Sequence, residues 1–157
     1  MLPPNVSSNL SRVESSIALM ESAIPGSDIR VQGVFSSHLV ILASGHVEIS
    51  VLEIIGSYVK ARSNPLISNF SIKTLERENS LNSEKICKIL DKFNKDWKDS
   101  LFDKLANSER EAVDSLKTLR DQIAHGKPNG TGYLVVKQYF KESCKYIGKL
   151  NDVVIGA

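Results

Sequence analysis

The stretch from about Asp28 to Arg62 constrains the fold more than any other part of the chain. Its apolar side chains recur at steps of three and four positions, which is the spacing of one face of an α-helix. The positions are Val31, Phe35, Leu39, Leu42, His46, Ile49 and Leu52. Gly45 and Gly56 lie inside it, and because a glycine in a helix costs about 1 kcal/mol relative to alanine, we expect a neighbouring helix to approach closely there. Ser63-Asn64-Pro65 ends the pattern, so we predict one long helix.

The other segments also show helical spacing, and none shows the alternation that is typical of a strand. We predict helices over about 7–23, 28–62, 109–124 and 133–154. Between them, 66–80 suits one short helix, and 83–105 suits one helix or two that break near Asn94. The predicted fold is therefore all-α, an antiparallel bundle of about five to seven helices. We expect one domain, 7–157, after an irregular tail, 1–6, in which Pro3 and Pro4 block a helix.

The composition is that of an ordinary globular chain, with 41% apolar residues, 24% charged residues and a net charge of +2. This charge does not by itself indicate nucleic-acid binding, so the basic residues would have to be clustered. Cys87 and Cys144 are isolated and lack metal-ligand spacing, which indicates reduced thiols and a cytoplasmic protein. We expect neither a signal peptide nor a membrane span, because charged residues interrupt the longest apolar stretches.

The predicted helix over about 109–124 carries the candidate site, Leu119 to Gly126. Ser108 with Glu111 three residues later matches a capping box at its start, and Gly126 suits the position after its last turn. Arg120 and His125 lie five positions apart, which places them about 140° apart around a regular helix. Their side chains therefore converge only if the helix frays at His125 or if a second chain takes part.

Each of these residues also has a purely structural interpretation. Arg120 would then cap carbonyls or form a surface ion pair, and His125 would be a favourable residue at a helix C-terminus. Asp121 either orients Arg120 or His125 across a dimer or is an exposed carboxylate. Glu48 shares a helical stripe with apolar residues, so it needs a cationic partner, for which Arg120 is a candidate, unless it reaches solvent.

The chain resembles a HEPN domain, and more narrowly the RiboL-PSP-type HEPN group, over about residues 35–154. The resemblance is carried by residues 42–48, 84–97 and 119–126, with the motif on the penultimate long helix. It implies a metal-independent endoribonuclease without a cofactor that acts as a homodimer. Such proteins are often toxins or phage-defence effectors with an antitoxin or immunity partner. Arg120 and His125 fall on the motif positions, and Asp121 occupies the polar position after the arginine.

One position departs from a well-known branch of that family. In that branch a tyrosine, which is the target of AMPylation, lies two residues after the histidine. Here that place is taken by Lys127. The resemblance therefore does not extend to regulation by AMPylation at this site.

RNA cleavage without a metal uses the ribose 2′-hydroxyl as the nucleophile. It requires a base for that hydroxyl, an acid for the leaving 5′-oxygen and positive charge on the phosphorane. Histidine suits both proton roles, and the planar fork of arginine suits phosphate oxygens. One chain offers one such pair, whereas a symmetric dimer offers two of each. The expected products carry a 2′,3′-cyclic phosphate and a 5′-hydroxyl.

A row of lysines at every fourth position follows on the predicted final helix. It consists of Lys137, Lys141, Lys145 and Lys149. Lys127, Lys137 and Lys141 are candidates for contacts with an RNA backbone, although such a row is more often a solvated face. His38 and His46 lack ligand partners and are interpreted as packing residues, not metal ligands. The alternative to the ribonuclease is a non-catalytic helical dimer that binds RNA or a protein partner.

Overall fold

The computed structural model describes residues 1–156 and forms this part of the chain into seven α-helices. They are α1 (Pro4–Ala23), α2 (Ile29–Arg62), α3 (Pro65–Leu75), α4 (Ser83–Phe93), α5 (Lys95–Lys104), α6 (Asn107–Ala124) and α7 (Tyr133–Val154). No strand occurs within residues 1–156. The prediction of an all-α chain with the motif on the penultimate helix is therefore confirmed.

Helix α2 is the central element of the bundle. It has 34 residues, which corresponds to a length of about 50 Å. Its start is fixed by Asp28, whose side chain accepts a hydrogen bond from the Arg30 N–H at 2.7 Å. It packs against α1, α3, α6 and α7, so its buried surface extends around much of the helix. The prediction of a single apolar stripe is wrong for this reason: Val31 and Ile49 are exposed, whereas Ser50 is fully buried.

The two glycines of α2 do not mark a close helix contact. A methyl group added at Gly45 would meet nothing within 4 Å, and one at Gly56 would meet only the Ile72 side chain at 3.9 Å. The expectation of close backbone approach is therefore wrong for Gly45. At Gly56 an added methyl group would make only an ordinary van der Waals contact.

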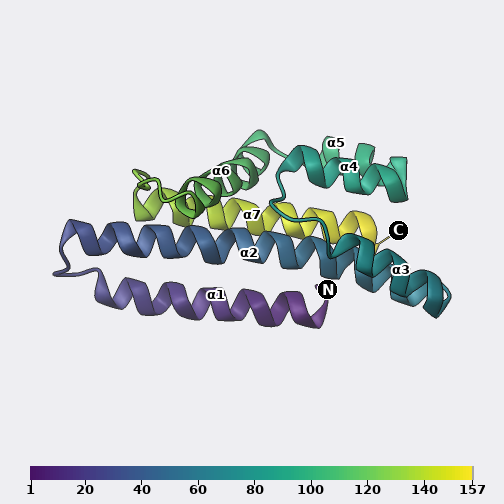
Figure 1. Ribbon diagram of the computed structural model, residues 1–157, viewed down its shortest axis with the longest axis horizontal. Helices are drawn as coiled ribbons and strands as arrows, with labels where there is room; N and C mark the ends of the chain where they lie inside the picture. The colour runs from purple at the N-terminus through teal and green to yellow at the C-terminus, as the bar shows by residue number, and fades with distance from the viewer. Residues whose placement is uncertain (157) are drawn as a thin grey trace.

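Figure 1 shows α1, α2 and α7 side by side along the long axis of the molecule, with α6 over α7 and with α4 and α5 near one end. The chain directions in Figure 1 make α1 antiparallel to α2, and α6 antiparallel to α7, but α2 and α7 parallel. A hydrogen bond of 2.6 Å from Ser36 Oγ, near the start of α2, to the carbonyl of Thr131, just before α7, agrees with this direction. The bundle is thus only partly antiparallel, because α3 to α6 carry the chain back before α7 begins.

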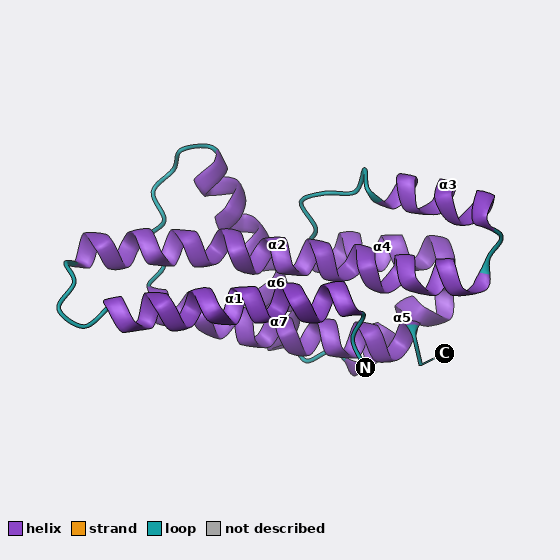
Figure 2. Ribbon diagram, turned by 90° about the horizontal axis from the view of Figure 1, so that it is seen from below, coloured by secondary structure: helices purple, strands orange, loops and turns teal. Residues whose placement is uncertain are grey.

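Figure 2 shows α3 beside α4 at the end of the bundle where both termini lie. Of the two alternatives for 83–105, one helix or two, the structure has two. They break at Asn94, which ends α4 and also caps α5 by accepting a hydrogen bond from the Asp96 N–H. The N-cap of α4 is Asn82, whose side chain accepts a hydrogen bond from the Lys85 N–H at 2.8 Å.

Two predicted helix starts need correction. The irregular tail is shorter than 1–6, because α1 already begins at Pro4 and Val6 is fully buried. Proline is well tolerated at the first position of a helix, where its missing N–H would have no partner. The capping box of α6 is also misplaced: α6 begins at Asn107, and Glu109 accepts a hydrogen bond from the Ala106 N–H at 2.8 Å.

The core consists of two apolar clusters that meet along α2. One cluster joins the second half of α2 to α4, α5 and the end of α7, with Ile54, Ile86, Leu101 and Leu150 fully buried. The other joins the first half of α2 to α1, α6 and the start of α7, and includes Leu39, Leu116 and Val136. Helix α6 therefore packs across α2 and α7, and this packing positions its C-terminal end.

By length and composition alone, α2 is long and apolar enough to cross a membrane. However, 61% of its most apolar window is buried inside the bundle, and the core helix of a water-soluble protein has the same properties. We attribute the apolar character of α2 to its central place in the core.

His46 is a buried histidine on α2 that makes the fold sensitive to acid. Its side chain is 1% exposed, its Nδ1 lies 2.8 Å from Asn9 Oδ1, and its ring packs edge-on against Phe140. Burial lowers the pKa of His46 to about 4. The unfolded chain binds a proton at His46 more tightly than the folded chain does. The contribution of neutral His46 to the free energy of unfolding is therefore fully present above about pH 6.5. It falls by at most about 3 kcal/mol as the pH drops towards about 4.

We expect His46→Gln to remove most of this pH dependence. Urea unfolding at pH 7.5 and at pH 5 measures it, and the wild-type chain should lose about 2 kcal/mol more than the variant between the two values. Equal losses in both chains would contradict the role of His46.

Candidate functional site

Arg120 is held by a carboxylate from the central helix. Arg120 Nη1 lies 3.6 Å from Glu48 Oε1, and the two side chains are 34% and 21% exposed. The pairing of Glu48 with Arg120 that the sequence indicated is therefore present. In the described part of the chain the guanidinium makes no other hydrogen bond or ion pair. Its positive charge also helps to lower the pKa of the neighbouring Asp121.

Ser80, in the α3–α4 connection, joins Glu48 to Asp121. Its backbone N–H donates to Glu48 Oε1 at 2.6 Å, and its hydroxyl donates to Asp121 Oδ1 at 3.0 Å. Lys117 Nζ lies 2.6 Å from the other oxygen of Asp121. Lys117 above all, together with the Ser80 hydroxyl, lowers the pKa of Asp121 below its usual value. Asp121 is therefore an ionised carboxylate with partners inside its own chain.

The sequence did not identify Ser80 or Lys117 as part of this network. Lys117 precedes Asp121 by four positions, which is a recognised helix ion-pair spacing and was available as a signal. Ser80 belongs to an Asn-Ser pair that marks only the end of a predicted helix. No local pattern indicates that this turn reaches α2 and α6.

His125 is the C-cap of α6, and its side chain is exposed. Its N–H still donates to the Asp121 carbonyl at 3.0 Å, so the helix remains hydrogen-bonded as far as His125. Gly126 follows with φ +71°, and the N–H groups of Gly126 and Lys127 donate to the carbonyls of Ile123 and Gln122. This is a Schellman motif, and it confirms the predicted role of Gly126.

The loop after His125 is fastened to the start of α2. Asn129 Nδ2 donates to Ser36 Oγ at 3.1 Å, and Ser36 Oγ donates to the Thr131 carbonyl at 2.6 Å. Asn129 Oδ1 also accepts a hydrogen bond from the Thr131 N–H at 3.0 Å. Both ends of the motif therefore contact α2: Arg120 contacts Glu48, and the loop after His125 contacts Ser36.

We expect Gly126→Ala to destabilise the chain by about 1 kcal/mol, because an L-residue is disfavoured at φ +71°. Gly130→Ala is the matched control. An added methyl group meets nothing within 4 Å at either glycine, but Gly130 does not adopt a positive φ in this range. Equal melting temperatures for the two variants would contradict a requirement for the left-handed conformation at Gly126.

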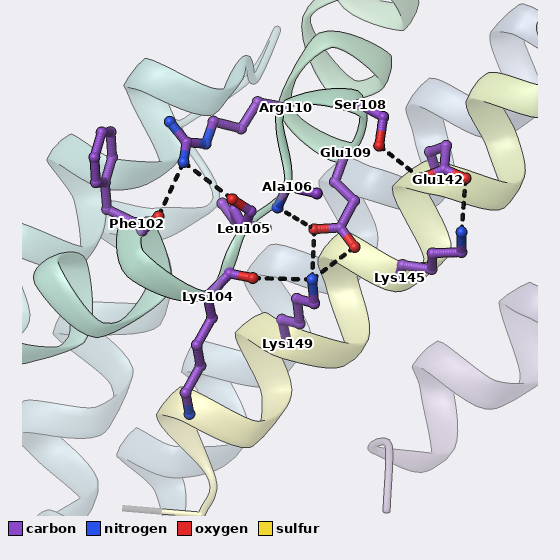
Figure 3. Close-up of polar contacts among 10 residues, drawn as sticks. All are labelled: Phe102, Lys104, Leu105, Ala106, Ser108, Glu109, Arg110, Glu142, Lys145 and Lys149. Atoms are coloured by element: carbon purple, nitrogen blue, oxygen red, sulfur yellow. Dashed lines mark hydrogen bonds and ion pairs between the residues drawn. The ribbon is translucent and has the colours of Figure 1, made fainter.

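Most of the lysine row on α7 is neutralised within the chain. Lys137 pairs with Glu21, Lys145 with Glu142 at 2.7 Å, and Lys149 with Glu109 at 2.7 Å. Figure 3 shows the last two pairs beside the α5–α6 turn. Lys141 and Lys127 are exposed, and neither side chain forms an ion pair within residues 1–156. Of the three predicted RNA contacts, Lys137 is therefore the weakest candidate.

The remaining histidines and cysteines lie apart from this network. His38 is exposed and His46 is buried. Both cysteines are free, and burial raises the pKa of Cys144 to about 12, so its thiol stays protonated at neutral pH. Within residues 1–156 no three His, Cys, Asp or Glu side chains are grouped so as to hold a metal ion.

The chain is thus an all-helical bundle that carries Arg120 and His125 near the end of its penultimate helix. The family model of RiboL-PSP-HEPN matches residues 7–156, nearly the whole chain. The chain belongs to the RiboL-PSP-HEPN family. Neither curated proteins nor solved structures give a match. HEPN proteins are generally associated with ribonuclease activity, so family membership indicates an RNA-related role.

Proposed function

We propose that the chain is a metal-independent endoribonuclease whose site forms between two copies of the chain. Arg120 binds the scissile phosphate and stabilises its developing charge, while His125 transfers protons to or from the ribose 2′-hydroxyl and the leaving 5′-oxygen. Asp121 and Glu48 support these residues, and Lys127 and Lys141 contact the RNA backbone.

The observation that carries the proposal is the intact end of α6. Because hydrogen bonding continues to His125, the helix does not fray there, and regular geometry keeps Arg120 and His125 about 140° apart. A second chain would bring an arginine and a histidine from different protomers to one phosphate. Two chains also supply the two proton-transfer groups that the reaction requires. We therefore expect a homodimer in which each protomer faces the other with its α6 end.

Incubation of the purified protein with RNA in the presence of a chelator tests the reaction. We expect cleavage to persist, with fragments that carry a 2′,3′-cyclic phosphate and a 5′-hydroxyl. Cleavage that stops with the chelator, or fragments with a 3′-hydroxyl and a 5′-phosphate, would exclude the mechanism. Activity per chain should also fall on dilution below the dimerisation constant, while circular dichroism shows an unchanged helix content.

We further propose that the protein is a cytoplasmic toxin or defence effector that an antitoxin or immunity protein restrains. This biological role rests on the family alone. Expression of the wild-type chain without a partner should arrest growth, whereas a cleavage-deficient variant should not.

A non-catalytic RNA-binding or protein-binding dimer is the competing function. The contact between Arg120 and Glu48 favours it, since an arginine that is already paired loses part of its attraction for phosphate. RNA affinity that survives Arg120→Ala, with no cleavage at any protein concentration, would identify this alternative.

A further inference from the structure

We propose that Ser80 is a positioning residue of this site, which holds Glu48 and Asp121 at a fixed separation and so sets the place of Arg120. The inference rests on the proposed ribonuclease function and adds a residue outside the Arg–His motif. It starts from one turn of the α3–α4 connection, which Figure 1 shows running from the end of α3 to the start of α4.

Ser80 has an unusual backbone conformation. Its φ of 53° makes it the one non-glycine residue with a positive φ within residues 1–156. This conformation costs about 1 kcal/mol or more for an L-residue and persists only where the surroundings impose it. Two hydrogen bonds to carboxylates, at 2.6 Å and 3.0 Å, impose it here. Bonds to ionised acceptors are among the stronger ones in proteins, so they offset the cost of the turn.

The two acceptors belong to the two helices that carry the site. Glu48 lies on α2, and Asp121 lies on α6 directly after Arg120. The side chain and the main chain of one residue therefore bridge both helices at the level of Arg120. Without the hydroxyl, Ser80 would lose its bond to α6 and keep its bond to α2, while the start of α4 would still be held to α6 by the hydrogen bond from the Ser83 N–H to Asp114 Oδ1 at 2.7 Å.

Ser80 and Arg120 also share one oxygen atom. Glu48 Oε1 accepts the Ser80 N–H at 2.6 Å and faces Arg120 Nη1 at 3.6 Å. The first distance is a short hydrogen bond, whereas the second exceeds hydrogen-bond range. Ser80, not Arg120, therefore makes the close hydrogen bond to Glu48 Oε1. Arg120 is thus oriented by the carboxylate without a close hydrogen bond to it.

Ser80→Gly and Ser80→Ala separate this role from that of a simple turn residue. Glycine suits φ 53° better than serine does, so a simple turn residue predicts wild-type activity for Ser80→Gly. A positioning role through the hydroxyl predicts that both variants lose kcat by about tenfold with KM within about twofold, because small displacements of catalytic groups have effects of this size or larger. Steady-state cleavage of a short RNA gives both constants, and thermal unfolding confirms that each variant is folded.

Ser108→Ala is the matched control, because Ser108 also donates one side-chain hydrogen bond to a carboxylate, Glu142 Oε2 at 3.1 Å. It lies at the opposite end of α6 and should keep wild-type kcat. Wild-type kcat in Ser80→Gly, or an equal loss in Ser108→Ala, would overturn the positioning role. The wild-type chain and His125→Ala in the same assay report on the ribonuclease function separately. A wild-type chain that does not cleave RNA overturns both proposals. An active wild-type chain with unaffected Ser80 variants overturns the positioning role alone.

Discussion

Replacing His125 by alanine is expected to abolish RNA cleavage while leaving the fold intact. General acid–base catalysis by a positioned side chain contributes about 10²- to 10⁴-fold to a rate. In the proposed dimer one substitution removes both histidines, so the loss should lie at or beyond the upper end of that range. The His125 side chain is exposed, and its backbone N–H makes the hydrogen bond that ends α6. Alanine preserves that bond, so stability should change by less than about 1 kcal/mol.

His38→Ala is the control for this experiment. His38 is also an exposed histidine, but it lies on α2 and belongs to no part of the proposed site. Cleavage rates, melting temperature and sedimentation should match the wild type for His38→Ala, whereas His125→Ala should differ in cleavage alone. Residual cleavage above one tenth of the wild-type rate in His125→Ala, or an equal loss in His38→Ala, would remove His125 from the mechanism.

The helices of this fold could be predicted because each leaves a local signature. The range of α2 follows from its apolar spacing and from Ser63-Asn64-Pro65, which ends the pattern, and the predicted range 133–154 matches α7. The errors occur where tertiary contacts decide. Several sides of α2 are covered by other helices, so a single stripe does not describe its buried face. The parallel direction of α2 and α7 depends on the path of four intervening helices, which spacing along the chain does not encode.

The candidate site shows the same division. The ion pair of Glu48 with Arg120 could be anticipated, because a carboxylate in an apolar stripe requires a cation. The role of Ser80 could not, since its two acceptors lie 32 and 41 positions away in the chain. The lysine row was visible in the sequence, but its partners Glu21 and Glu109 come from other helices. Most of these lysines therefore form ion pairs within the chain, and the sequence of one helix does not show which residues of other helices are the partners.

Lys149 is the lysine of that row with the largest expected effect on stability. Its Nζ lies 2.7 Å from both oxygens of Glu109, whose side chain is 4% exposed, and it also donates to the Lys104 carbonyl at 2.9 Å. Figure 3 shows Lys149 reaching from α7 to the turn between α5 and α6, where Glu109 also accepts the Ala106 N–H. Removal of one partner from a buried pair leaves an uncompensated charge, which costs about 3–5 kcal/mol.

We therefore expect Lys149→Met to lower the free energy of unfolding by about 3 kcal/mol, at the low end of that range because Lys149 itself is 34% exposed. For a chain of this size the melting temperature should fall by roughly 10 °C. Lys145→Met is the matched control: it removes a lysine from the same helix, but that side chain is 60% exposed. Its partner Glu142 is 11% exposed, but this carboxylate keeps hydrogen bonds from Ser108 Oγ and Gln138 Nε2 when Lys145 is removed. We therefore expect a smaller loss for Lys145→Met than for Lys149→Met in urea denaturation.

A second substitution identifies the cause of the loss. If the unpaired carboxylate of Glu109 is responsible, Glu109→Gln added to Lys149→Met should recover part of the stability, because the neutral amide is less costly to bury and can still accept the Ala106 N–H. If the loss came from the missing lysine side chain alone, the double variant would be no more stable than Lys149→Met. Recovery would mean that Lys149 acts chiefly as the counter-ion of a buried carboxylate, and such a lysine is not free to bind an RNA phosphate.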